Sequence, residues 1–112
     1  MKLEELSKQL VGAHHKLMNA THQYRLDASA TKRFEAELKS IVATSIMEGV
    51  ITGKNQAERD AVEQKLFAGQ YKQLEELKEV ESFSYLKLET AKIAVQMWMA
   101  LLRIEELTRD NS

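Results

Sequence analysis

Residues 83–107, FSYLKLETAKIAVQMWMALLRIEEL, decide the fold of this chain. The stretch contains neither Pro nor Gly, and its apolar residues recur at steps of three and four, the spacing of an amphipathic helix. They form two neighbouring rows. One row is Leu88, Ala91, Val95, Trp98 and Leu102, and the other row is Phe83, Leu86, Thr90, Ile93, Met97, Ala100, Ile104 and Leu107. Because one neighbouring helix covers only one row, the two rows predict a helix that packs on more than one side.

The rest of the chain also has the composition of long helices. Its 112 residues include no Pro and only four Gly, and Ala, Leu, Glu, Lys and Gln dominate. A length of this order fits one small domain. We therefore predict an all-α fold, a helical bundle forming a single domain over residues 1–112, with a long C-terminal helical region.

The expected helix boundaries come from caps and from breaks in the apolar pattern. Upstream, an unbroken row is formed by Leu3, Leu6, Leu10, Ala13, Leu17, Ala20 and Tyr24. Asp27, Ser29 and Thr31 are all suitable N-cap residues, so a boundary is expected there, although a continuous bend is also compatible. Gly69 and residues 81–84 are the weak points farther on, and a kink, if the helix has one, is placed near 81–84. The predicted helices span about 2–26, 31–52, 56–80 and 83–108, the last two either separate or joined.

A turn between the second and third helices is the clearest local signal. Gly53 suits the left-handed position just after a helix, and Asn55 with Glu58 three residues later resembles a capping box. The sequence therefore predicts a tight turn at residues 52–55.

This turn also carries a resemblance to known proteins. Residues 53–59, GKNQAER, lie between an apolar helix end and a long charged helix, and the pattern over about 46–107 resembles small helical proteins encoded by bacteriophages and prophages. Such proteins are commonly accessory factors that bind host components, among them inhibitors of bacterial defence and oligomeric sponges that sequester nucleotide signals. The resemblance thus implies a cytoplasmic location in a bacterial host and a binding role.

The two apolar rows favour self-association. If a hairpin within the chain covers one row, the other remains as an apolar patch able to drive coiled-coil-like association, most simply as a symmetric dimer. The alternative is a monomeric bundle in which the first two helices together cover both rows. The expected interface residues of a homo-oligomer are Phe83, Leu86, Ile93, Met97, Trp98, Leu101 and Ile104.

Two groups of basic residues are candidates for binding a phosphorylated ligand. Lys54, Asn55 and Arg59 surround the predicted start of the third helix, where free backbone N–H groups attract anions. Arg25, Lys32 and Arg33 flank the expected junction of the first two helices. A competing interpretation of the turn is that Asn55 and Glu58 use those N–H groups as a cap.

Composition argues against several other functions. Sixteen basic and 17 acidic residues leave a net charge of -1, so duplex DNA is not an expected partner. No apolar run reaches the roughly 20 residues that cross a bilayer, so no membrane contact is expected. The chain has no Cys, and His14, His15 and His22 are predicted to face solvent without carboxylates beside them. We expect neither a metal nor a cofactor.

A binding role without catalysis follows, because no nucleophile or phosphate-loop motif is present. Our main hypothesis is a non-enzymatic, phage-encoded antagonist of host defence that sequesters a small phosphorylated signal or blocks a host protein. The alternative is a structural or scaffolding coiled-coil module, accessory to phage replication or recombination.

Overall fold

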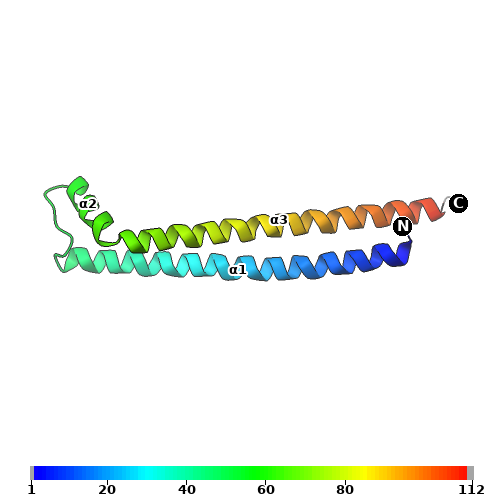
Figure 1. The fold of residues 1–112 in the computed structure, drawn as a ribbon, viewed down its shortest axis with the longest axis horizontal. Helices are drawn as coiled ribbons and strands as arrows, with labels where there is room; N and C mark the ends of the chain where they lie inside the picture. The colour runs from blue at the N-terminus through cyan, green and yellow to red at the C-terminus, as the bar shows by residue number, and fades with distance from the viewer. Residues whose placement is uncertain (1, 111–112) are drawn as a thin grey trace. The chain divides into compact units, whose positions relative to one another are not determined.

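The computed structural model describes residues 2–110, and these form three α-helices without a strand. Figure 1 shows α1 (Leu3–Met47), α2 (Gln56–Leu66) and α3 (Ala68–Asp110). The predicted all-α fold with a long C-terminal helical region is confirmed. The residues group into two compact units: the first joins α1 up to Leu26 with α3 from Ser82 onward, and the second is Asp27–Glu81. The single domain over 1–112 stays a prediction.

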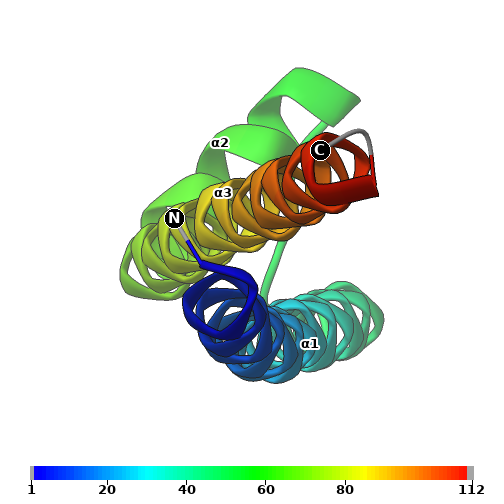
Figure 2. The ribbon, with the colours of Figure 1, turned by 90° about the vertical axis from the view of Figure 1, so that its right-hand side faces the viewer.

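In the first unit, α1 and α3 run side by side in opposite directions (Figures 1 and 2). The row from Leu3 to Tyr24, from here the α1 row, faces the row from Leu88 to Leu102 of α3, from here the inner row; the row from Phe83 to Leu107 is the outer row. Leu6, Ala13, Leu88 and Val95 are buried between the α1 row and the inner row. The remaining members of both rows are half-buried. This alternation is the packing that steps of three and four produce, because such residues repeat along one side of each helix. The inner row is therefore covered by α1 of the same chain.

The second unit contains the C-terminal part of α1, all of α2 and the first turns of α3. Leu38 of α1 and Leu74 of α3 are buried. The hydroxyl of Thr31, which is 5% exposed, donates to the main-chain oxygens of Asp27 at 3.1 Å and Leu77 at 3.4 Å. No residue of α2 is buried.

The expected boundary at residues 27–31 is wrong, because α1 is continuous from Leu3 to Met47. Asp27 and Thr31 continue the steps of three and four from Tyr24, so they occupy inward positions of one long helix. Their polarity suggested a cap, but the Thr31 hydroxyl donates to Asp27 O within α1 and to Leu77 O of α3.

The last two expected helices are joined at residues 81–84, because α3 is helical throughout this stretch. Ser84 lies on the inner side of α3 and is only 6% exposed. The break falls instead at Phe67, which separates α2 from α3. Its φ of -112° departs from helical values. Gly69, the other weak point, lies inside α3.

The end of α1 is fixed by Gly49 rather than by Gly53. Gly49 has a φ of +76°, and its N–H donates to Ile46 O at 3.1 Å while Val50 N–H donates to Ser45 O at 2.9 Å. These two bonds form a Schellman motif, which ends a helix at a left-handed glycine. The helix therefore ends at Met47, five residues before the expected position.

Gly53 has a different role, which is to let the link approach α2. A Cβ atom there would lie 2.8 Å from Glu58 Cβ and 2.9 Å from Arg59 N. The predicted cap is confirmed: Glu58 N–H donates to Asn55 Oδ1 at 2.9 Å, and Lys54 N–H donates to Glu58 Oε2 at 2.7 Å. Each residue thus has a structural role: Gly53 allows the close approach, and Asn55 and Glu58 cap the start of α2.

Candidate functional site

The outer row of α3 forms an exposed apolar face on the first unit. Its six large side chains keep between 47% and 64% of their surface exposed. They are Phe83, Leu86, Ile93, Met97, Ile104 and Leu107, with Thr90 and Ala100 between them. We call these eight residues the α3 face. It matches the patch that was expected to remain if a hairpin covered the inner row.

The size of the α3 face distinguishes it from scattered surface apolar residues. Six large side chains, each about half exposed, present on the order of 600 Å² of largely apolar surface. Monomeric soluble proteins rarely expose a contiguous apolar patch larger than a few hundred Å². The α3 face is therefore a candidate interaction surface.

A groove of about 780 Å³ adjoins the α3 face in the first unit. Small residues of both helices are among those that line it. The α1 side is lined by Gln9, Gly12, Ala13, Lys16, Asn19, Ala20 and Gln23, and the α3 side by Phe83, Leu86, Lys87, Thr90, Ala91, Ala94 and Trp98. Phe83, Leu86 and Thr90 belong to both the groove and the α3 face. The two therefore form one continuous surface.

The groove carries positive charge and aromatic rings. Lys16 and Lys87 line it without an acidic residue among the described lining residues. Lys87 Nζ lies 4.7 Å from the centre of the Phe83 ring, within the range of a cation–π interaction. Trp98, expected at an oligomer interface, is half-buried in the groove wall, whereas Leu101 is 39% exposed.

The polar residues on the α1 side of the groove were not predicted. Gln9, Lys16 and Gln23 recur every seven residues, so they follow one side of α1 next to the α1 row. That period was visible in the sequence. What the sequence lacked was the direction from which α3 approaches, since this decides which flank of α1 becomes a groove wall.

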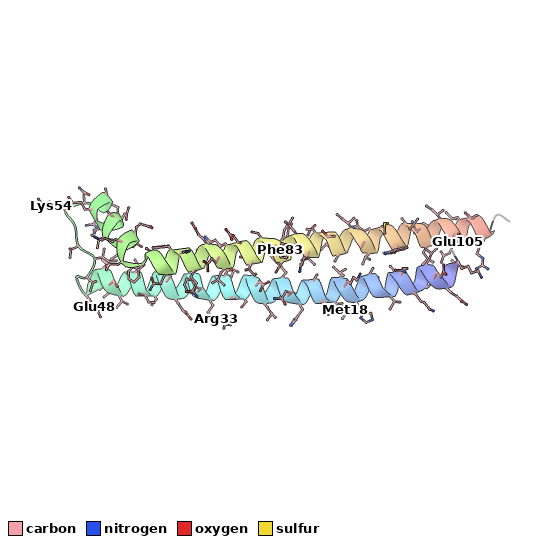
Figure 3. All side chains as sticks on the ribbon, viewed as in Figure 1. Met18, Arg33, Glu48, Lys54, Phe83 and Glu105 are labelled. Carbon is pink, nitrogen blue, oxygen red and sulfur yellow. The ribbon has the colours of Figure 1, made fainter. Side chains whose placement is uncertain are left out.

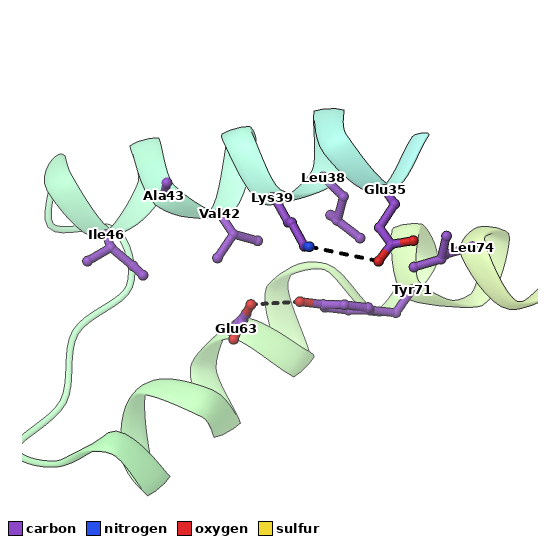
Figure 4. Close-up of a pocket in the computed structure, with 9 residues that line it drawn as sticks. All are labelled: Glu35, Leu38, Lys39, Val42, Ala43, Ile46, Glu63, Tyr71 and Leu74. Carbon is purple, nitrogen blue, oxygen red and sulfur yellow. Dashed lines mark hydrogen bonds and ion pairs between the residues drawn. The ribbon is translucent and has the colours of Figure 1, made fainter. Parts of the chain in front are cut away.

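The second unit has a smaller pocket of about 370 Å³, which Figure 4 shows between the three helices. Leu38, Val42, Ala43, Ile46 and Leu74 form its apolar part, and Glu35, Lys39, Glu63 and Tyr71 its polar part. The Tyr71 hydroxyl donates to Glu63 Oε1 at 2.6 Å. This bond to a carboxylate, with a smaller contribution from burial, raises the pKa of Tyr71 to about 12.

The polar groups of this pocket bind one another. Glu63 holds Tyr71, and Lys39 Nζ lies 3.9 Å from Glu35 Oε1 with 79% of the lysine side chain exposed. A pocket that holds an unpaired buried polar group signals a ligand, but here each polar group already has a partner. The pocket is therefore a weaker candidate than the α3 face.

The structure brings Lys54, Asn55 and Arg59 together at the start of α2. The cap uses part of the anion-binding capacity on which this candidate site depends: Asn55 occupies one N–H group, and the Glu58 carboxylate accepts from the Lys54 N–H. Arg59 Nη2 donates to Gln56 Oε1 at 3.3 Å. A bound phosphate at this position would meet the negative charge of Glu58. The anion site remains a prediction.

The other basic group does not lie at a helix end. Arg25, Lys32 and Arg33 are exposed along the middle of the continuous α1, where backbone N–H groups are used by the helix itself. Arg33 and Lys54 of the second unit lie well apart (Figure 3). The two predicted basic groups are thus not joined into one site within this unit.

His14, His15 and His22 are exposed, as expected. In the described part of the chain, no group of three or more His, Asp or Glu side chains is arranged to hold a metal ion. None of the helices formed by residues 2–110 combines the length and the apolar character that crossing a bilayer requires. Comparison with models of protein families, with curated proteins and with solved structures gave no match.

Proposed function

We propose that the protein is a non-enzymatic helical module that self-associates through the α3 face, giving a dimer that presents binding surfaces to other molecules. The observation that carries this proposal is the exposure of six large apolar side chains in one row of α3. Of the two roles expected from sequence, the scaffolding module follows directly from such association. A phage-encoded protein that blocks a host protein would use the same dimer.

The area of the α3 face supports a stable contact. Two copies that each cover on the order of 600 Å² would bury about 1,200 Å², the lower end of the range for specific protein–protein interfaces. Each copy also adds the neighbouring groove, whose small lining residues allow another helix to come close.

Sedimentation velocity at micromolar concentration tests the association. The wild-type chain is expected to sediment as a dimer. The double variant Ile93→Glu/Met97→Glu is expected to be monomeric, because it places two charges in the centre of the α3 face. Ile93 and Met97 are 64% and 47% exposed, so neither charge disturbs the core of the first unit.

Met18→Glu is the matched control. Met18 is 66% exposed and lies on the outer side of α1 in the first unit (Figure 3), away from the residues that line the groove. This variant should remain dimeric, with the helical circular dichroism of the wild type. A wild-type monomer at 100 µM would defeat the proposal, and so would a dimer that tolerates both glutamates.

A second candidate function is sequestration of a phosphorylated aromatic ligand in the groove of the first unit. The observation that favours it is that Lys16, Lys87 and Trp98 line one groove, which has no acidic residue among its described lining residues. Calorimetric titration with a nucleotide tests it. Saturable binding lost in Lys16→Ala and Lys87→Ala would support this function, whereas a titration without heat would leave the self-associating module.

A further inference from the structure

We infer that a second copy docks on the α3 face in the antiparallel direction, centred on residue 95, so that Glu89 of each copy meets Arg103 of the other. The inference rests on the proposed self-association and specifies its geometry. It follows from three properties of α3: the extent of its apolar face, the charges on one flank and the small residues on the other.

The α3 face is symmetric about residue 95. Antiparallel pairing centred there places the eight residues opposite one another as Phe83 with Leu107, Leu86 with Ile104, Thr90 with Ala100, and Ile93 with Met97. Each large side chain then meets another large one, and Thr90 meets the small Ala100. A twofold axis through this point buries the whole exposed row, since nothing at either end is left without a partner.

One flank of the face carries charges that fit only this direction. Glu89, Gln96 and Arg103 recur every seven residues along that flank. In an antiparallel pair each flank faces the same flank of the other copy. Glu89 of each copy therefore meets Arg103 of the other, and the two Gln96 residues meet at the twofold axis. In a parallel pair this flank would face the other flank of the second copy, so that Glu89 would meet Ala94 and Gln96 would meet Leu101. Only the antiparallel pair forms ion pairs.

Within the described part of their own chain, Glu89 and Arg103 form no strong ion pair, so both are available to a second copy. Glu89 Oε1 lies 3.1 Å from Lys92 Nζ, but the two side chains are 39% and 50% exposed, which makes this a weak pair within one helix. Among the described residues, Arg103 has no ion-pair partner. Glu89 can therefore turn to Arg103 of a second copy at small cost.

The opposite flank of the α3 face carries a small residue, Ala94, which also lines the groove. Lys87, Ala94 and Leu101 recur along this flank, and antiparallel pairing brings Ala94 next to Ala94 at the axis. The small side chain lets the two α3 helices approach. Leu101 of the second copy then lies beside Lys87, at the groove, where its 39% exposed side chain finds apolar cover.

Site-directed crosslinking reads out the direction without interference, because the chain has no cysteine of its own. Leu86→Cys and Ile104→Cys are made as separate single variants, and a short bis-maleimide is added to each alone and to a re-equilibrated mixture. Residues 86 and 104 lie about 27 Å apart along one helix, beyond the reach of the reagent. The antiparallel dimer predicts crosslinks in the mixture between 86 and 104, with neither variant crosslinking to itself.

The possible outcomes separate the inference from the proposed function. Crosslinking of Leu86→Cys to itself would establish a parallel pair and overturn the inference, while leaving self-association intact. A dimer by sedimentation without any crosslink would also overturn it. Monomeric wild-type protein would overturn both. Each variant is first shown by sedimentation to retain the oligomeric state of the wild type.

Charge reversal is an independent test of the pairing between Glu89 and Arg103. Glu89→Arg and Arg103→Glu are each expected to raise the dimer Kd about tenfold at low salt, because each change brings like charges together at two equivalent places. The double variant Glu89→Arg/Arg103→Glu restores opposite charges and should return the Kd to within about twofold of the wild type. A double variant as weak as the singles would contradict the pairing.

Discussion

At the scale of single residues, Tyr71 and Glu63 join α2 to the first turns of α3 within the second unit. Their hydrogen bond of 2.6 Å joins side chains eight positions apart, across the break at Phe67. No residue of α2 is buried, and this bond is one of the contacts that join α2 to α3. A neutral hydroxyl is required as the donor, which couples the bond to pH.

Tyr71→Phe is expected to lower the free energy of unfolding by up to about 1 kcal/mol at pH 7, a value kept small by solvent screening. The folded-state pKa of about 12 lies above the ordinary 10.0, so the stabilisation is fully present below pH 10 and is lost as pH rises toward 12. Urea unfolding of both chains between pH 7 and 11.5 measures this. A difference between the two chains that does not shrink above pH 10 would contradict the assignment.

At the scale of helices, polarity at an inward position was mistaken for the end of a helix. Thr31 and Ser84 are polar, so the sequence predicted boundaries near both, yet each is buried within a continuous helix. The steps of three and four continue through them, and this periodicity was the better guide. By contrast, the cap at Asn55 and the exposed outer row of α3 were predictable, because capping and amphipathic spacing depend only on residues close in sequence.

Continuity of α1 predicts a strong effect of Ser29→Pro. Proline in a helix interior removes a backbone hydrogen bond and clashes with the preceding turn, so this variant should lose about 3 kcal/mol or more of stability. Ser29 is exposed, and Ser29→Ala should be neutral or slightly stabilising. Chemical denaturation of the two variants gives the comparison. If proline were as well tolerated as alanine, a loop at residues 27–31 would be the better description.

At the scale of the whole molecule, the core is thin. Among the described residues, seven apolar side chains are buried and no side chain is completely buried. A chain of 112 residues with so little fully buried volume gains limited hydrophobic stabilisation by itself. The groove and the α3 face are where further burial is available. Association and folding should therefore be linked.

This linkage predicts that the melting temperature depends on protein concentration. A tenfold increase should raise Tm by about 3–5 °C, because ligand-like binding of a second copy stabilises only the folded chain. The double variant Ile93→Glu/Met97→Glu should melt at a lower temperature that does not change with concentration. Differential scanning calorimetry from 10 µM to 1 mM tests both. A wild-type Tm independent of concentration would uncouple folding from association.

The link between α1 and α2 has a consequence for how the chain can be divided. Between Lys39 and Gln73 the one buried residue is Ile51, and residues 52–58 are all exposed. A backbone cut between Thr52 and Lys54 therefore removes no buried side chain from either side. One fragment would carry α1 with Ile51 and the other α2 with α3, and the rows that pack α1 against α3 remain complete on both. The protein is thus suited to fragment complementation, in which two separately expressed pieces reassemble and each can carry its own reporter.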